Sequence, residues 1–407
     1  MSVEKPRAES ILARFLSLEP LDNRFPALHG LRVIAILSVV QFHVTWIFLE
    51  ASIKQDNELA IISLTIFFGM DLFFILSGFL IGSILLRSLD TSGSQNLARF
   101  YVRRISRTFP PYYVVLTYLA LTTLLTVTQR SHLFYEYIYA TNFVSLRRGK
   151  ILMFWGWSLA LEEQFYLLVP LLFFVLARLR SDRGRLVLLT LIWASALVVR
   201  IWIFYAHAPW TDLHLYEALY FKPYTRFDTL VSGILLAFVH ARKKEQLTEW
   251  LKAPAHRALL LVPSLGCLWL LLRPDLFGAY YTQMVHVFLW GSVTSVMYFI
   301  WLVLLLHTDG FVQRALGRGI FRRIATLGYG VYLVHIPVAD RVIVPLARAL
   351  LARDVPMAAV WPISLVLLMA ISLGLGYIIH VLIEKPSLRI RERIDAALAR
   401  REAAAKA

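Results

Sequence analysis

Long apolar segments alternate with short polar connections along most of the chain. A membrane-crossing α-helix needs about 20 predominantly apolar residues, because the hydrocarbon core is about 30 Å thick and each residue rises about 1.5 Å. The pattern predicts ten such helices, at residues 28–49, 60–86, 110–129, 157–177, 186–207, 227–241, 257–273, 283–307, 325–350 and 358–383. We therefore expect an all-α, polytopic transmembrane helix bundle.

Composition supports this fold class. The chain is 58% hydrophobic and only 17% charged, which excludes a soluble globular protein and a disordered chain. The net charge of +16 does not indicate nucleic-acid binding, because Lys and Arg cluster after the second, fourth, sixth, eighth and tenth spans. Under the positive-inside rule this distribution predicts that both termini are cytoplasmic.

One connection departs from this charge pattern. Arg130, Arg147, Arg148 and Lys150 follow the third span, on the side that should be poor in basic residues. Either the spans are miscounted at this point, or the loop has a role outside, such as meeting an acidic acceptor. Aromatic residues in the same loop either stack on sugar rings or form an interfacial belt, and they are Phe134, Tyr135, Tyr137, Tyr139, Trp155 and Trp157.

The chain divides into three parts. We expect a cytoplasmic N-terminal segment at 1–27 without a cleavable signal peptide, a membrane domain at 28–384, and a basic cytoplasmic tail at 385–407. The longest connections are too short for a second soluble domain. The single cysteine, Cys267, permits no internal disulfide and indicates no metal site.

The first span carries two ionisable residues, Arg32 and His43. Charged groups inside a membrane are costly and are therefore functional candidates. Eleven residues at about 100° each amount to three turns and roughly 20° more, so both side chains share one helix face, roughly 16 Å apart. The imidazole should lie well inside the membrane, where a neutral histidine can act as a base.

Two further spans contain carboxylates in polar company. Asp71 lies in FFGMDLFFILSGFLIG, in which Ser77, Gly78 and Gly82 form a small-residue face that allows close helix packing. Glu162 lies one turn beyond Ser158 and one turn before Tyr166, which predicts a polar stripe on one helix face. A purely lipid-facing helix needs no such stripe.

An arginine-rich segment, ARFYVRRISRTFPPYY, precedes the third span. Arg104 and Arg107 are i,i+3 neighbours, and Pro110 and Pro111 suit the first turn of a helix. Arginine is favoured where phosphate is gripped, because its planar fork matches phosphate oxygens. These arginines either fix the topology or bind a phosphate-bearing donor that enters from the cytosol.

Seven segments, in order, resemble motifs of the acyltransferase-3 family of integral membrane acyltransferases. Arg32 and His43 match the family's Arg-x10-His, and Gly328 stands where a serine is usual in LGYGVYLVHIPV. The other segments are FFGMDLFFILSGFLIG, RRISRTFP, WSLALEEQFYLLVP, TRFDTLVSGILLA and VLIEKPSLR. The site candidates carried over from the later segments are Glu162, Arg226, Asp228, Tyr332 and His335.

The resemblance implies an enzyme of a bacterial inner membrane that moves an acyl group, often acetyl, from acyl-CoA to a hydroxyl of a sugar or glycan. It implies no tightly bound cofactor. Arg103, Arg104 and Arg107, with Arg32, would hold the CoA phosphates, and His43 would act as base or acyl relay.

Two questions stay open from the sequence. Glu162 or Asp71 would orient the His43 imidazole, or Glu162 would pair with Arg226 instead. A proton-coupled transporter is the alternative function, because intramembrane His, Asp and Glu also build proton relays.

Overall fold

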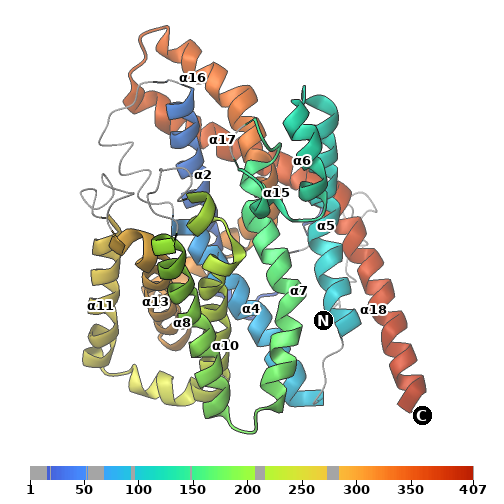
Figure 1. Cartoon of the computed structure of the whole chain (residues 1–407), viewed down its shortest axis with the longest axis vertical. Helices are drawn as coiled ribbons and strands as arrows, with labels where there is room; N and C mark the ends of the chain where they lie inside the picture. The colour runs from blue at the N-terminus through green and yellow to red at the C-terminus, as the bar shows by residue number, and fades with distance from the viewer. Residues whose placement is uncertain are drawn as a thin grey trace, which may run out of the picture.

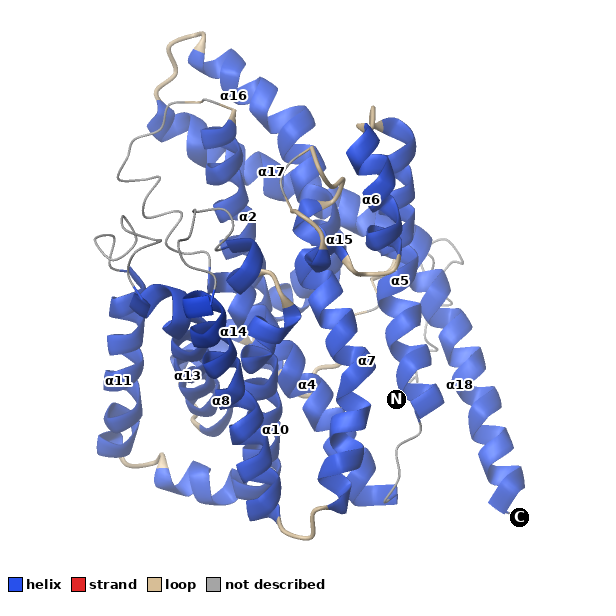
Figure 2. Cartoon of the chain, in the orientation of Figure 1, coloured by secondary structure: helices blue, strands red, loops and turns tan. Residues whose placement is uncertain are grey.

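The computed structural model describes residues 16–406, except 19, 52, 54–67, 93–96, 147–148, 207–215 and 273–283. Within these ranges every regular element is a helix and no strand occurs (Figure 2). The prediction of an all-α bundle is therefore confirmed. Most of the predicted N-terminal segment 1–27 and the start of the second predicted span lie outside the described residues.

Eight of the described helical segments are long and apolar enough to cross a membrane. They are built from α2 (Pro26–Glu50), α4 (Gly69–Ser92), α7 (Trp157–Arg178), α8 (Asp182–Ala206), α11 (Pro254–Leu272), α13 (Met284–His307), α15 (Gly319–Val338) and α17 (Met357–Ile379). The third and sixth predicted spans correspond to α5 (Leu97–Thr122) and α10 (Pro223–Trp250), which are not among the eight. The count of ten spans and the cytoplasmic termini stay predictions.

Shorter elements connect or extend these helices. They are α6 (Val127–Tyr137), η2 (Thr141–Phe143), η3 (Phe154–Gly156), η4 (Tyr216–Tyr220), α14 (Phe311–Leu316), η5 (Ala339–Ile343), α16 (Val344–Leu351), η6 (His380–Glu384) and α18 (Lys385–Lys406). The last two continue α17, so the predicted basic tail is helical as far as it is described.

The prediction that Pro110 and Pro111 occupy the first turn of a helix is wrong. α5 begins at Leu97, so Pro110 and Pro111 lie inside the helix, although an interior proline removes a hydrogen bond and crowds the preceding turn. Packing of α15 and α18 against α5 compensates for this cost. The arginine-rich segment is consequently helical, and Arg104 and Arg107 lie on one face of it.

The small-residue face predicted on α4 is confirmed by its packing against α10. A Cβ atom added at Gly78 would lie 2.0 Å from the Leu230 carbonyl oxygen, and one added at Gly233 would lie 2.3 Å from the Ile75 carbonyl oxygen. No side chain fits at such distances, so the two backbones meet directly. This contact fixes α4 and α10 as a pair at the centre of the bundle (Figure 1).

The bundle has two distinct ends. Arg242, two turns before the end of α10, bonds to Asp90 on α4 at 2.7 Å and to Asp182 on α8 at 3.2 Å, so three connections rich in basic residues meet. We call this the basic end; it is the lower end in Figure 1. α7 runs from η3 to the basic end and spans about 33 Å. The opposite end carries α6, and we call it the α6 end.

Two clusters of buried apolar residues fill the interior. The first lies mainly between α2, α5, α7, α15 and α17, and includes Val40, Leu116, Leu159 and Leu333. The second lies mainly between α4, α7, α8, α10 and α13, and includes Phe79, Phe173, Phe238 and Met297. α7 contributes to both clusters, so it forms the boundary between the two regions.

Candidate active site

Two histidines from distant parts of the chain meet in the first cluster. His43 on α2 and His335 on α15 are neighbours because these two helices pack against each other. His43 Nδ1 lies 2.9 Å from His335 Nε2, and the ring centroids are 5.0 Å apart. His335 is fully buried. Of the residues predicted for the site, His335 is therefore the one that contacts the His43 imidazole, whereas Glu162 and Asp71 lie in other groups.

The backbone of α15 fixes the tautomers of this pair. His335 Nδ1 lies 2.7 Å from the Tyr332 carbonyl oxygen, which can only accept, so Nδ1 carries the proton. Nε2 of a neutral His335 is then an acceptor, and His43 Nδ1 must donate to it. A neutral His43 consequently has its lone pair on Nε2. This assignment follows from the hydrogen-bond geometry.

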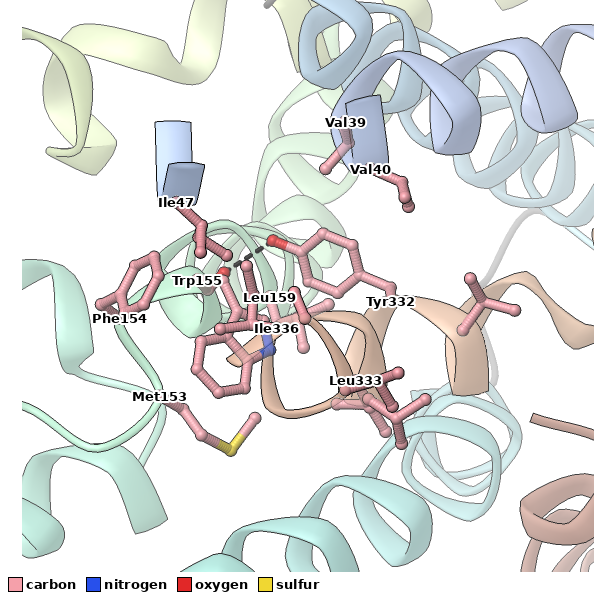
Figure 3. Packing of buried hydrophobic residues seen from close by; sticks show 14 of the residues in the cluster. Val39, Val40, Ile47, Met153, Phe154, Trp155, Leu159, Tyr332, Leu333 and Ile336 are labelled. Carbon is pink, nitrogen blue, oxygen red and sulfur yellow. Dashed lines mark hydrogen bonds between the residues drawn. The ribbon is translucent and has the colours of Figure 1, made fainter. Parts of the chain in front are cut away.

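Tyr332, whose backbone carbonyl bonds to His335, uses its hydroxyl to connect α15 to α7. The Tyr332 hydroxyl donates to the Trp155 carbonyl oxygen at 2.6 Å and accepts from Ser158 Oγ at 2.6 Å. Figure 3 shows this Tyr332 bond among the packed side chains of Leu159, Ile336 and Leu333. Tyr332 and Ser158, both predicted for the site, thus tie α15 to α7 and to the loop that precedes it.

Three arginines gather on the basic-end side of the histidines. Arg32 interacts electrostatically with Arg104, Arg107 and Glu162. The Arg104 guanidinium lies 3.7 Å from the centroid of the Tyr166 ring, a cation–π contact. Its Nε atom is buried and has no hydrogen-bond partner among the described residues. Three like charges with an unsatisfied donor form a place where an anion would be bound favourably.

Glu162 belongs to the same group. The Tyr166 hydroxyl donates to Glu162 Oε1 at 3.1 Å and also contacts Ser77 Oγ. The predicted stripe is confirmed for Glu162 and Tyr166, whereas Ser158 bonds to Tyr332 instead. Since Ser158 and Glu162 are one turn apart on α7, the arginine group adjoins the histidine pair.

Arg103 lies apart from these arginines. It forms an ion pair with Asp395 on α18 at 2.9 Å, and 55% of its side chain is exposed. The side chain points away from Arg104 because successive helix residues are about 100° apart. The sequence predicts that it holds the donor with Arg104 and Arg107, whereas in this structure it joins α5 to α18.

Asp71 is held in a buried ion pair in the second cluster. Its carboxylate lies 2.8 Å from Arg226 Nη2 and accepts from Thr229 Oγ1 at 3.2 Å and Trp290 Nε1 at 3.1 Å. The alternative in which Glu162 pairs with Arg226 is wrong, because Asp71 takes that position. These bonds join α4, α10 and α13.

A second buried pair lies beside the first. Asp228 bonds to Arg200 at 2.8 Å, and Arg200 also donates to the Thr225 carbonyl oxygen and to Ser292 Oγ. None of the sequence motifs includes Arg200, although a lone arginine inside an apolar span is a usable signal of a functional or structural site. Through these ion pairs, Arg226 joins α10 to α4 and Asp228 joins α10 to α8.

Comparison with known protein families shows to which family the chain belongs. A family described as an acyltransferase domain matches residues 25–381. The chain belongs to this acyltransferase family. The matched residues include the histidine pair, the arginine group and the two buried ion pairs. The acyltransferase is a multi-pass membrane protein, as its apolar helices and its bacterial relatives indicate. No solved structure shows significant similarity to it.

Two named relatives illustrate the family. The peptidoglycan O-acetyltransferase OatA of Listeria monocytogenes is 26% identical over 333 residues, which cover 77% of this chain and 49% of the relative. A Bacillus subtilis protein named "Putative peptidoglycan O-acetyltransferase YrhL" is 28% identical over 339 residues, covering 77% and 48% respectively. The acyltransferase thus spans about half the length of these relatives. The comparisons give no support to the transporter alternative.

Proposed function

We propose that the protein is a membrane-embedded O-acyltransferase that moves an acyl group, acetyl in the simplest case, from acyl-CoA to a hydroxyl of a glycan. The family match and the names of the relatives support this class of reaction and suggest peptidoglycan as the acceptor. The observation that carries the proposal is the His43–His335 pair, because it directs the lone pair of a neutral imidazole onto a defined nitrogen.

In direct transfer, His43 Nε2 takes the proton of the acceptor hydroxyl while the hydroxyl oxygen attacks the thioester carbonyl. The new C–O bond forms and the C–S bond breaks, so the product is an ester. The leaving CoA thiolate takes the proton from His43 and leaves as the thiol. His335 holds the imidazole in the required orientation throughout.

An acyl-enzyme route uses the same nitrogen. His43 Nε2 attacks the thioester carbonyl, the CoA thiolate leaves, and an acyl-imidazole forms. The Nδ1 proton then passes to His335 Nε2, which lies 2.9 Å away. In the second step the acceptor hydroxyl attacks the acyl group, and the C–N bond breaks as His335 returns its proton to His43 Nδ1. The hydroxyl proton goes to solvent and balances the CoA thiolate released in the first step, which is recovered as the thiol. The two routes differ in whether an acylated His43 can be trapped without acceptor.

Arg32, Arg104 and Arg107 are the proposed donor-binding residues. Their positive charges lie toward the basic end, which faces the cytosol in this proposal, and CoA carries phosphate groups that match them. Arg32 is roughly 16 Å from His43 along α2, a separation that the extended pantetheine arm would cross. The thioester would then reach the imidazole from the basic end.

The test is acyl transfer by the purified protein in lipid nanodiscs with labelled acetyl-CoA and O-deacetylated peptidoglycan strands. His43→Ala should lower kcat about 10²- to 10⁴-fold because the general base or nucleophile is lost. The melting temperature of the variant should stay close to that of the wild type, which shows that the fold is intact. Near-normal turnover by His43→Ala would refute the mechanism.

A further inference from the structure

A cleft of about 360 Å³ opens at the α6 end of the bundle. α5, α6, the loop of residues 149–153, η3, α15 and η5 contribute its walls. These parts lie toward the α6 end and the arginines lie toward the basic end, so the cleft is on the far side of His43 from the arginines. Polar and aromatic side chains line it together with aliphatic ones such as Leu119, Ile151 and Ile336; the polar and aromatic residues are Thr123, Gln129, Phe154, Trp155, Asp340 and Arg341. Its volume falls within the range of about 300–1,000 Å³ that is usual for small-molecule sites.

The inner wall of the cleft is also the wall of the catalytic pair. Ile336 lines the cleft and directly follows His335 in α15. Phe154 lines it as well, and the centroid of its ring lies 6.4 Å from that of His43. A single layer of side chains therefore separates the cleft from His43. A molecule in the cleft and a donor at the arginines would approach the imidazole from opposite ends.

Trp155 presents an unused hydrogen-bond donor at this wall. Only 3% of the residue is exposed, and its indole Nε1 has no hydrogen-bond partner among the described residues. A buried donor without an acceptor is costly, which makes such a group a sign of a missing partner. Trp155 lines the cleft while its Nε1 is covered, so an oxygen atom of a bound molecule supplies the acceptor once a neighbouring side chain moves aside.

The loop that carries Phe154 and Trp155 is held in place by Glu136. The buried carboxylate of Glu136 accepts hydrogen bonds from the backbone N–H groups of Leu152 at 2.9 Å and Met153 at 2.8 Å. On the other side the Trp155 carbonyl oxygen accepts from Tyr332. The aromatic wall is thus fixed from both α6 and α15, as a binding site requires.

The rim of the cleft combines groups that suit a carbohydrate. Arg341 Nη2 donates to Thr123 Oγ1 at 3.0 Å, which fixes the guanidinium across the opening. Hydroxyl, amide, carboxylate and guanidinium groups surround the aromatic wall, and a sugar ring offers hydroxyls to such groups and an apolar face to an aromatic ring. We propose that this cleft binds the acceptor glycan and delivers one of its hydroxyls past Phe154 to His43; the proposal rests on the function proposed above.

The test is protection of an introduced thiol by the glycan. In a Cys267→Ser background, Thr123→Cys places a thiol at the rim of the cleft. Ser131→Cys places one on the exposed surface of α6, outside the cleft, as a matched control. Both variants, in nanodiscs without acyl-CoA, are labelled by a charged thiosulfonate reagent with and without O-deacetylated peptidoglycan strands. The strands should slow labelling of Thr123→Cys several-fold and leave Ser131→Cys unchanged.

A second variant addresses the donor on Trp155. Trp155→Phe keeps an aromatic ring but removes the N–H, so KM for the strands should rise roughly 5- to 10-fold while KM for acetyl-CoA stays unchanged. Slowed labelling of Thr123→Cys without any acyl transfer would support the cleft and refute the proposed reaction. Unchanged labelling at strand concentrations that saturate transfer by the wild type would overturn the cleft proposal and leave the reaction standing.

Discussion

The two buried clusters handle polar groups in opposite ways. In the first cluster the polar groups are neutral: His43 bonds to His335, the His335 ring bonds to the Tyr332 backbone carbonyl, and the Tyr332 hydroxyl bonds to Ser158. In the second cluster full charges are matched in two ion pairs, Asp71–Arg226 and Arg200–Asp228, each at 2.8 Å. One region keeps a proton-accepting nitrogen, whereas the other leaves its charges paired.

This difference indicates that the first cluster serves catalysis and that the second cluster serves folding. A buried carboxylate that is paired with arginine and bonded to further donors is held in place, because moving it would leave a buried charge without its partner. A neutral imidazole needs no counter-charge, so it can stay inside the bundle and still accept a proton. We therefore expect substitutions in the second cluster to damage folding first, and substitutions in the first cluster to damage catalysis first.

The largest expected effect is on stability in the second cluster. Asp71→Ala leaves Arg226 buried without its partner, which should cost about 3–5 kcal/mol of unfolding free energy. Thermal unfolding in detergent and the yield from membranes measure this loss. Asp71→Leu combined with Arg226→Met removes both charges and should lose much less. A single variant that melts like the wild type would break the contrast between the clusters.

The next effect is on catalysis in the first cluster. His335→Ala removes the group that orients His43 and should lower kcat about 100-fold, with the KM for acetyl-CoA nearly unchanged. His335→Gln retains an acceptor for His43 Nδ1 and should lose only about 10-fold. Both are measured with labelled acetyl-CoA and glycan strands. Equal losses in the two variants would show that the hydrogen bond is not what His335 contributes.

A smaller effect concerns Glu136, which lies at the α6 end outside both ion pairs. Burial raises the pKa of its carboxyl from 4.5 to about 7, and the bonds from two backbone amides limit that rise. The folded state therefore holds the proton more tightly than the unfolded chain does. The stabilising contribution is complete below about pH 4.5 and is lost as the pH rises through about 7.

Melting temperatures between pH 5 and 7.5 measure this contribution. Wild-type protein should lose on the order of 1–2 kcal/mol relative to Glu136→Gln over this range, because the amide cannot ionise. Parallel curves for the two proteins would mean that Glu136 does not titrate in this interval.

The smallest effect separates Arg103 from its neighbour. Arg103 is half-exposed and pairs with Asp395, so Arg103→Ala should cost less than about 1 kcal/mol and leave the KM for acetyl-CoA unchanged. Arg104→Ala should instead raise that KM about 10-fold, because the arginine group loses one of its three charges. A larger KM effect for Arg103 than for Arg104 would move the donor site toward α18.

Local sequence patterns predicted the helices and several contacts between or within them. Apolar run lengths predicted the helices, the spacing of Ser77, Gly78 and Gly82 predicted the close packing of α4, and helical periodicity predicted the Glu162–Tyr166 contact. These features depend on neighbours along a single helix. The start of α5 escaped prediction because tertiary packing overrides the local preference of Pro110 for a helix start.

The partners of the buried polar groups did not follow from the sequence. His43 and His335 are 292 positions apart, and no local pattern says that they meet rather than His43 and Asp71. The same holds for Asp71 with Arg226 and for Arg200 with Asp228.

The sequence by itself determined that the chain is a helical membrane bundle with a histidine and arginines on one face of its first helix, because periodicity and hydrophobicity act within each segment. Only the tertiary structure decided which polar groups share a site, because a buried charge must find its partner on whichever helix packs beside it. The packing of α2 on α15 brings His335, rather than Asp71 or Glu162, to His43. The packing of α4 on α10 brings Asp71, rather than Glu162, to Arg226.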